Sequence, residues 1–183
     1  MIEKPKKTDI AWFAGMLDGE GYIGIILQAP HKNRARELPI YRLTIEITST
    51  HLPTIEKIKS IWQVGRVTYR DRSSINAKWH PSWRWDSGSN AAAHILSLSL
   101  PYLCTKKAKA EIAIAFQKRK ATRTIQYRGG WNKRIPVIEF EGDRKYAEAL
   151  KGLSNNVKVE IEEILDASQQ LSLFDGGLDN GVN

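Results

Sequence analysis

The chain has 183 residues, of which 42% are hydrophobic and 26% are charged, as in an ordinary soluble globular domain. It carries a formal net charge of +8 and a single cysteine, Cys104. No apolar run is long enough to span a bilayer, and the first residues lack the apolar core of a signal peptide. We therefore expect an intracellular protein in a reducing compartment, without a disulfide framework and without a membrane anchor.

The positive charge is unevenly distributed along the chain. Residues 1–138 carry 24 Lys and Arg against 10 Asp and Glu, a net charge of +14, whereas residues 139–183 carry 4 against 10, a net charge of −6. A basic region of that size predicts a polyanionic partner, although solvated surface charge alone would give the same count. We expect a basic core over residues 1–138, acidic helices over 139–174 that pack on it, and a disordered tail over 175–183.

The first expected element is a helix over residues 9–20. Its apolar residues lie on nearly every face, and Ala11, Ala14 and Gly15 are small enough to let a second helix approach closely. The helix stops at two acids and two glycines, Asp18–Gly21, so two carboxylates lie at a helix C-terminus, where the macrodipole favours cations. A bound divalent cation would offset that repulsion, although an acidic turn without a ligand explains the same residues.

Four later stretches alternate between apolar and polar residues, which is typical of strands with one buried and one exposed face. They cover residues 22–28, 40–48, 66–72 and 77–86. Pro81 indicates an edge or bulged position in the last of them. The first two strands predict a hairpin, joined by a polar and basic connection over residues 30–39.

Helices are expected between and after the strands. One spans residues 50–62 with Thr50 as a possible N-cap, and the next spans residues 89–103 with Ser89 as its N-cap. Pro101 interrupts the second helix, and a further apolar-rich helix follows to about residue 120. The acidic end of the chain holds two more candidates, over residues 143–153 and 157–171.

The polar faces of the four strands share a bias toward Arg, Lys, Gln, Thr and Ser. A two-stranded ribbon of that kind fits the major groove of DNA, where Arg reads guanine, Gln reads adenine and Glu accepts from cytosine. A merely solvated face remains possible for any single strand, but all four repeat the bias. The predicted DNA-contacting residues are Gln28, Lys32, Arg34, Arg36, Arg42, Thr44, Glu46, Arg66, Thr68, Arg70, Arg72, Lys78, His80 and Arg84.

Two segments of the chain carry a resemblance to a known family. Phe13–Gly21 resembles the LAGLIDADG motif of the homing endonucleases, with Phe for the first Leu and Gly19-Glu20 for Ala-Asp. Pro101–Lys106 resembles the family's turn of Pro, an aromatic residue and Leu, which precedes a basic run and a helix. The resemblance covers roughly residues 9–120. It implies an α+β fold of αββαββα order, with an antiparallel four-stranded DNA-binding sheet and further helices at the C-terminus.

The resemblance also implies the residues of an active site. Glu20 and the Gly19 carbonyl would hold Mg²⁺, and Lys106 falls on the lysine that reaches the family's active site. Ser49 stands where the family has a polar residue, often Gln, that helps to hold catalytic solvent; Ser is shorter and could equally cap a helix. Asp18 is expected to be structural. We expect Mn²⁺ to substitute for Mg²⁺, and Ca²⁺ to support binding without cleavage.

The chain contains a single copy of the motif, so cutting both strands of a duplex requires a second chain. The implied assembly is a homodimer with two-fold symmetry, in which the first helices of the two chains pack together. The predicted interface residues are Ala11, Trp12, Ala14, Gly15 and Asp18.

The sequence therefore predicts a site-specific endonuclease that hydrolyses phosphodiester bonds in a long, near-palindromic DNA duplex with a divalent metal. Two alternatives stay open. One is a DNA-binding regulator on the same scaffold that does not cleave. The other is an intron RNA maturase that binds RNA through another basic surface, such as residues 118–133. The cytoplasm of a bacterium or phage host and an organelle would each fit as the location.

Overall fold

The computed structural model describes residues 5–29, 39–71, 73–75, 78, 80–122 and 137–154, and the structural statements below concern these residues. Four strands and five helices follow one another with one short 3-10 turn, η1. In chain order they are α1 (Lys7–Glu20), β1 (Gly21–Gln28), β2 (Ile40–Ser49), α2 (Leu52–Trp62), β3 (Arg66–Arg70), β4 (Ser82–Gly88), α3 (Ser89–Ser99), η1 (Leu100–Tyr102), α4 (Lys107–Ala121) and α5 (Val137–Ser154). The predicted αββαββα order is confirmed, and two more helices follow it.

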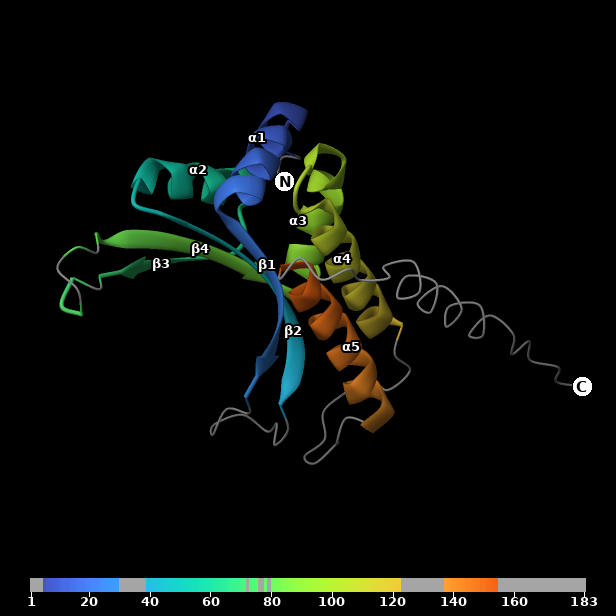
Figure 1. The fold of residues 1–183 in the computed structure, drawn as a ribbon. Coiled ribbons are helices and arrows are strands. Elements are labelled where there is room, and N and C mark those ends of the chain that lie inside the picture. The colour runs from blue at the N-terminus through green and yellow to red at the C-terminus, as the bar shows by residue number, and fades with distance from the viewer. Residues whose placement is uncertain are drawn as a thin grey trace, which may run out of the picture.

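The strands form one antiparallel sheet in the order β1-β2-β4-β3. The sheet curves strongly, and the helices lie on its convex side (Figure 1). No described helix covers the concave side, which is called the open face below. One face of the sheet is therefore left uncovered by the described helices, as the alternation of the four strands predicts.

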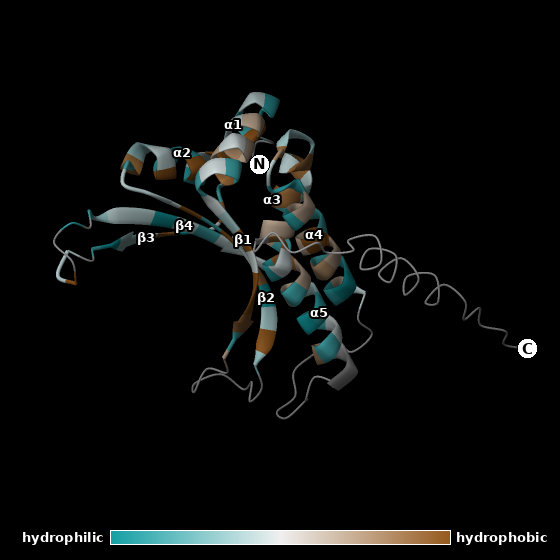
Figure 2. Cartoon of the chain, in the orientation of Figure 1, coloured by the Kyte–Doolittle hydropathy of each residue, from teal (hydrophilic) through white to brown (hydrophobic). Residues whose placement is uncertain are grey.

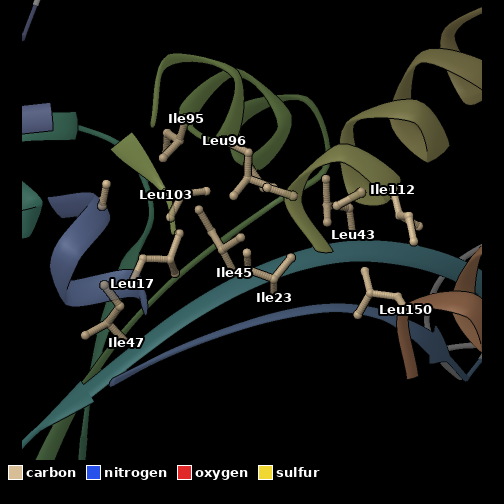
Figure 3. Packing of buried hydrophobic residues seen from close by; sticks show 14 of the residues in the cluster. Leu17, Ile23, Leu43, Ile45, Ile47, Ile95, Leu96, Leu103, Ile112 and Leu150 are labelled. Atoms are coloured by element: carbon tan, nitrogen blue, oxygen red, sulfur yellow. The ribbon is translucent and has the colours of Figure 1, made fainter. Parts of the chain in front are cut away.

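The core lies between the convex side of the sheet and the helices. Leu43, Ile45 and Ile47 of β2 are fully buried, because β2 is an inner strand beneath α1, α3 and α4. Figure 3 shows side chains of α1, β1, β2, α3, α4 and α5 meeting in this layer. Phe13 packs edge-on against Trp62 and Trp85, with ring centroids 5.0 and 5.7 Å apart. Hydrophobic and hydrophilic residues alternate along the elements around this core (Figure 2).

The helix α1 buries only one of its apolar faces within the chain. Its buried residues are Ile10, Phe13, Ala14 and Leu17, at helical spacing. Gly15 is exposed, and Trp12 is only partly buried. The expected helix is confirmed, but a single chain does not cover it all round.

Several predicted boundaries are wrong by a few residues. The N-cap of α2 is His51 rather than Thr50, and the N-cap of α3 is Gly88, with Ser89 as the first helical residue at a φ of 55°.

The strand β4 begins at Ser82 instead of residue 77, directly after Pro81, which has no N–H for the ladder. Since β4 lies between β2 and β3, the edge position inferred from this proline is wrong. The acidic helix α5 begins at Val137, ahead of its expected start at residue 143.

Other sequence predictions lie outside the described residues. These are Lys32, Arg34 and Arg36 in the connection between β1 and β2, Arg72 after β3, the helix over 157–171 and the tail over 175–183. Among the described helices, none combines the length and the apolar character needed to cross a membrane. Cys104 is an exposed free thiol.

Candidate functional site

The C-terminal end of α1 is held by the turn that precedes α4. The Asp18 carboxylate accepts hydrogen bonds from the backbone N–H groups of Cys104 (2.7 Å), Thr105 (3.3 Å) and Lys106 (2.9 Å). The Thr105 hydroxyl donates a fourth bond at 3.1 Å. The side chain of Asp18 therefore faces a turn of its own chain and anchors α1 to that turn, while the interface contact that we predicted for Asp18 remains a prediction.

Lys106 connects the same two segments in the opposite direction. Its ammonium donates to the backbone carbonyls of Leu17 (2.8 Å) and Asp18 (2.6 Å), in the last turn of α1. A cation at this end of a helix is favourable because the macrodipole leaves partial negative charge there. An ammonium has three donors, so one N–H of Lys106 remains beyond these two bonds.

The surroundings lower the pKa values of both groups. Burial works to raise the pKa of Asp18, but the hydrogen bonds from Cys104, Lys106 and Thr105 leave that pKa below its ordinary value. Burial is also the largest effect on Lys106, where it lowers the pKa of the ammonium; the charges of Asp18 and Glu20 act in the opposite direction. The hydrogen bonds of the Lys106 ammonium to the carbonyls of Leu17 and Asp18 place it in the last turn of α1, which ends at Glu20.

Glu20 is the last residue of α1, and its surroundings differ from those of Asp18. Its side chain is exposed, and within the described part of the chain it has no hydrogen bond or ion pair. Gly19 beside it is also exposed, with no atom within 4 Å of where a Cβ would stand. A carboxylate and a nearby backbone carbonyl are oxygen ligands of the kind that Mg²⁺ accepts. These residues therefore fit a magnesium ion.

One chain supplies only part of such a metal site. Among the described residues, no three His, Cys, Asp or Glu side chains gather closely enough to hold a metal ion. Mg²⁺ commonly binds through one or two carboxylates, several waters and phosphate oxygens of a substrate. Ligands beyond Glu20 and the Gly19 carbonyl are therefore not supplied by the described residues, and water or phosphate oxygens of a substrate are groups that could complete such a site.

Ser49 ends β2 at the same edge of the sheet as Glu20, because the pairing of Gly21 with Ile47 places Ser49 just beyond the start of β1. Its hydroxyl oxygen accepts the backbone N–H of His51 at 3.0 Å, at the entrance to α2. The hydroxyl hydrogen is not used by this bond, so Ser49 retains one donor. The catalytic role predicted for it remains a prediction.

The register places most of the predicted DNA-contacting residues on the open face (Figure 1). Glu46 of β2 lies opposite Tyr22 of β1 and Asp86 of β4, and Arg84 lies opposite Thr68. The predicted residues that occupy this face are Gln28, Arg42, Thr44, Glu46, Arg66, Thr68, Arg70 and Arg84. Lys78 and His80 do not, since both precede the start of β4.

Two residues of the open face are less available than we predicted. Thr44 is only 7% exposed, and its hydroxyl donates to the backbone carbonyl of Ser87 at 3.4 Å. Its neighbours across the sheet are both glycines, Gly24 and Gly88, and the side chains of Tyr22 and Arg42 lie over them. Thr44 is therefore part of the floor of the open face and not a surface contact.

Arg84 is the second of these residues. Its guanidinium lies between Glu46, at 3.2 Å, and Asp86, at 3.6 Å, and its side chain is only 16% exposed. Asp86 also pairs with Arg66 at 3.4 Å. Contact with a base would require Arg84 to give up two ion pairs, whereas Arg66 is 71% exposed and would give up one.

The predicted interface residues of α1 separate into two groups. Ala14 is fully buried inside the chain, so it cannot meet a partner, and that prediction is wrong. Gly15 is exposed with open space around it, while Ala11 and Trp12 are partly buried. Trp12 carries the Lys57 ammonium 4.1 Å from its ring centroid. Of these residues, Gly15 is exposed and Ala11 and Trp12 are partly exposed, so all three can still meet a partner.

Comparison with known proteins identifies the fold. No family model matches the sequence, and no match is found among curated proteins. The structure, however, is similar to the homing endonuclease I-CvuI in complex with its target, with a TM-score of 0.62 over 91% of this chain and 96% of that one. The chain has the homing endonuclease fold. The sequence identity to I-CvuI is 16%, so the arrangement of the elements is far better preserved than the side chains.

Two further homing endonuclease structures show the same arrangement. The archaeal, intron-encoded homing endonuclease I-Vdi141I, solved with DNA, has a TM-score of 0.60 at 12% identity, over 91% of this chain and 98% of that one. The meganuclease I-SmaMI, bound to uncleaveable DNA, has a TM-score of 0.53 at 15% identity, over 78% of this chain and 44% of that one. In this homing endonuclease fold, the LAGLIDADG-like segment Phe13–Gly21 forms the second half of α1 and its junction with β1.

Sequence reasoning missed two features of the site. The turn over Cys104 and Thr105 was not assigned a role, because its acceptor Asp18 lies more than 80 residues away in the sequence. Tyr22 was also missed: it lies half-buried on the open face, and its partial burial together with the Glu46 charge raises the pKa of its hydroxyl. Its one sequence signal is Gly24, two residues later on the same strand face, which leaves room for the ring.

Proposed function

We propose that the chain is a site-specific, metal-dependent DNA endonuclease that acts as a homodimer. The observation that carries this proposal is the end of α1, where the exposed Glu20 carboxylate has no partner in the described chain and the Lys106 ammonium is fixed nearby. The homing endonuclease fold supports it, because I-CvuI and I-Vdi141I were solved in complex with DNA. The open face supports it as well, since Arg42, Arg66 and Arg70 lie on it.

Each residue of the site has a chemical task in this proposal. Glu20, with the Gly19 carbonyl, would hold Mg²⁺, which supplies a Lewis acid that lowers the pKa of water and neutralises phosphate charge. Lys106 directs its remaining N–H toward the attacking water or the developing charge on the phosphate. Ser49 can orient water through its free donor. Mn²⁺ would substitute in such an oxygen-rich site, and Ca²⁺ would support binding without cleavage.

A second copy of the chain would complete the enzyme. Two α1 helices that meet through Ala11, Trp12 and Gly15 would bring the two Glu20 carboxylates together on a two-fold axis, with one for each DNA strand. Gly15 suits close helix approach because the space beyond its Cα is open. A two-fold symmetric enzyme reads a near-palindromic target, with the concave open faces of both chains along the major groove.

The test is cleavage of a library of long, partly palindromic duplexes with Mg²⁺ by the wild-type protein and by Glu20→Gln. The variant should lose cleavage by about 10³-fold or more, because the metal and its ligand contribute several kcal/mol to the barrier. It should bind the selected target as the wild type does in Ca²⁺. Glu56→Gln makes the same change at an exposed position of α2 and should cut normally.

Two outcomes would contradict the proposal. Wild-type cleavage by purified Glu20→Gln would remove Glu20 from the chemistry. Specific binding by the wild-type protein without any cutting in Mg²⁺ or Mn²⁺ would favour a DNA-binding regulator on the same fold.

A further inference from the structure

The end of α1 and the beginning of α4 neutralise each other through crossed charges. The carboxylate of Asp18, on α1, binds the backbone N–H groups of residues 104–106 that lead into α4. The ammonium of Lys106, at the N-cap of α4, binds the last carbonyls of α1. A helix N-terminus favours an anion and a C-terminus favours a cation, so both contacts have the favourable sign. We call this pair of contacts the reciprocal clamp.

The carboxylates of Asp18 and Glu20, at the end of α1, differ in how many hydrogen-bond acceptor positions remain unused. Asp18 accepts two bonds on Oδ1, from Thr105 Oγ1 and Lys106 N, and two on Oδ2, from Cys104 N and Thr105 N. A carboxylate has about four acceptor positions, so Asp18 has none left for another ligand. The Glu20 carboxylate accepts no hydrogen bond from the described residues, so all of its acceptor positions remain available to a ligand.

We propose that Asp18 is a positioning residue for Lys106, and that the reciprocal clamp aims the remaining N–H of the ammonium at the reacting phosphate beside Glu20. This inference rests on the proposed endonuclease function. A lysine side chain has four rotatable bonds and loses much of its freedom when it is fixed. The clamp fixes both of its ends, since Asp18 holds the backbone of Lys106 and the α1 carbonyls hold its ammonium.

The experiment is a double-mutant cycle on the single-turnover cleavage rate, measured with saturating enzyme on the selected target in Mg²⁺. The variants are Asp18→Asn, Lys106→Met and the double variant. Asp18→Asn should slow cleavage by about 10- to 100-fold, the usual cost of removing a partner that orients a reacting group. Target affinity in Ca²⁺ should change by less than about threefold, because Asp18 offers no free acceptor to DNA.

The decisive comparison is the effect of Asp18→Asn when Lys106 is absent. If Asp18 acts through Lys106, the substitution should slow the Lys106→Met variant by less than about twofold. An equal loss in both backgrounds would overturn the proposal, because it would mean that Asp18 acts on the fold or on the metal independently. Asp9→Asn makes the same change at the opposite end of α1 and should leave the rate unchanged.

Thr105→Val provides a second test that is mild for folding, since it removes only the hydroxyl donor at 3.1 Å from Asp18. It should slow cleavage by a few-fold in the wild type and have no further effect with Lys106→Met. A wild-type rate in both Thr105→Val and Asp18→Asn would overturn the proposal. If Glu20→Gln fails to stop cleavage, the proposed function fails instead, so the two failures are distinguishable.

Discussion

The two ends of α4 carry similar basic stretches and use them differently. The N-terminal end has Lys106, Lys107 and Lys109, and the C-terminal end has Lys118, Arg119 and Lys120. Lys106 lies at the end of α1, close to the exposed Glu20. At the other end, Arg119 pairs with Asp143 of α5 at 2.9 Å, and the Lys120 ammonium donates to the backbone carbonyl of Tyr41 at 2.7 Å.

The two ends of α4 differ in whether the acid near the basic residues is buried or exposed. Asp143 is 1% exposed, so its pair with Arg119 joins α4 to α5 inside the protein. Glu20 is open to solvent, so the charges around it are accessible to a substrate. A run of basic residues therefore does not by itself indicate a binding surface. The RNA surface considered over residues 118–133 has two of its three described cations, Arg119 and Lys120, in intramolecular contacts, and nothing in the described chain favours it.

The largest expected effect is on the stability of the protein, when the buried ion pair at the C-terminal end of α4 is broken. Asp143→Asn removes the carboxylate charge that pairs with the largely buried Arg119 guanidinium at 2.9 Å, and breaking a buried pair in this way should cost about 3–5 kcal/mol of unfolding free energy. Denaturant titration measures this loss. Glu148→Gln is the matched control, because its ion pair with Arg144 is exposed to solvent and contributes little to stability. Equal losses in the two variants would show that the Arg119–Asp143 pair does not hold α5.

At the N-terminal end of α4 the expected effect is on the rate of DNA cleavage. Lys106→Met should slow single-turnover cleavage by about 10²- to 10³-fold, the usual loss when one preorganised donor is removed from a transition state. Its affinity for the target in Ca²⁺ should stay close to that of the wild type. Lys120→Met also removes a lysine that binds a backbone carbonyl, and it serves as the control. If both variants cut at similar rates, the distinction between the two ends disappears.

The smallest expected effect is on the salt dependence of DNA binding. Lys107 and Lys118 are both exposed and lie at opposite ends of α4. Lys107→Ala should reduce the slope of log K against log salt concentration by about 0.9, as expected for one lost phosphate contact, whereas Lys118→Ala should leave it unchanged. Fluorescence anisotropy at several salt concentrations measures both slopes. The reverse result would place the duplex at the C-terminal end of the helix.

The fold could be predicted where the signal is local. Alternation in residues 40–48 indicated both the strand and its polar face, and the glycines after Asp18 marked the end of α1. The side of α1 that faces the core was less clear, because Ala11 and Ala14 are equally small and only packing distinguishes them. Periodicity gave no warning that Thr44 is buried, since that depends on glycines in two neighbouring strands.

The contacts that define the site could not be predicted from local patterns. The resemblance implied Glu20 and Lys106, but the partners of Asp18 and of Arg119 are set by chain segments far away in the sequence. Asp143 looked like one more surface acid in an acidic helix, although it is almost completely buried. Its counter-ion Arg119 looked like one more surface base. Pairing of this kind becomes visible only when the sheet and the helices are in place.

The reciprocal clamp also affects when the proposed nuclease can become active during its synthesis. Asp18 and Lys106 are 88 residues apart, and two hairpins and two helices are made between them. On the ribosome, α1 and Glu20 emerge well before the turn over residues 104–106, and contacts between distant segments form late. An incomplete chain carries the acid without its lysine. If Lys106 acts as proposed, fragments that end before residue 106 should therefore not cut DNA.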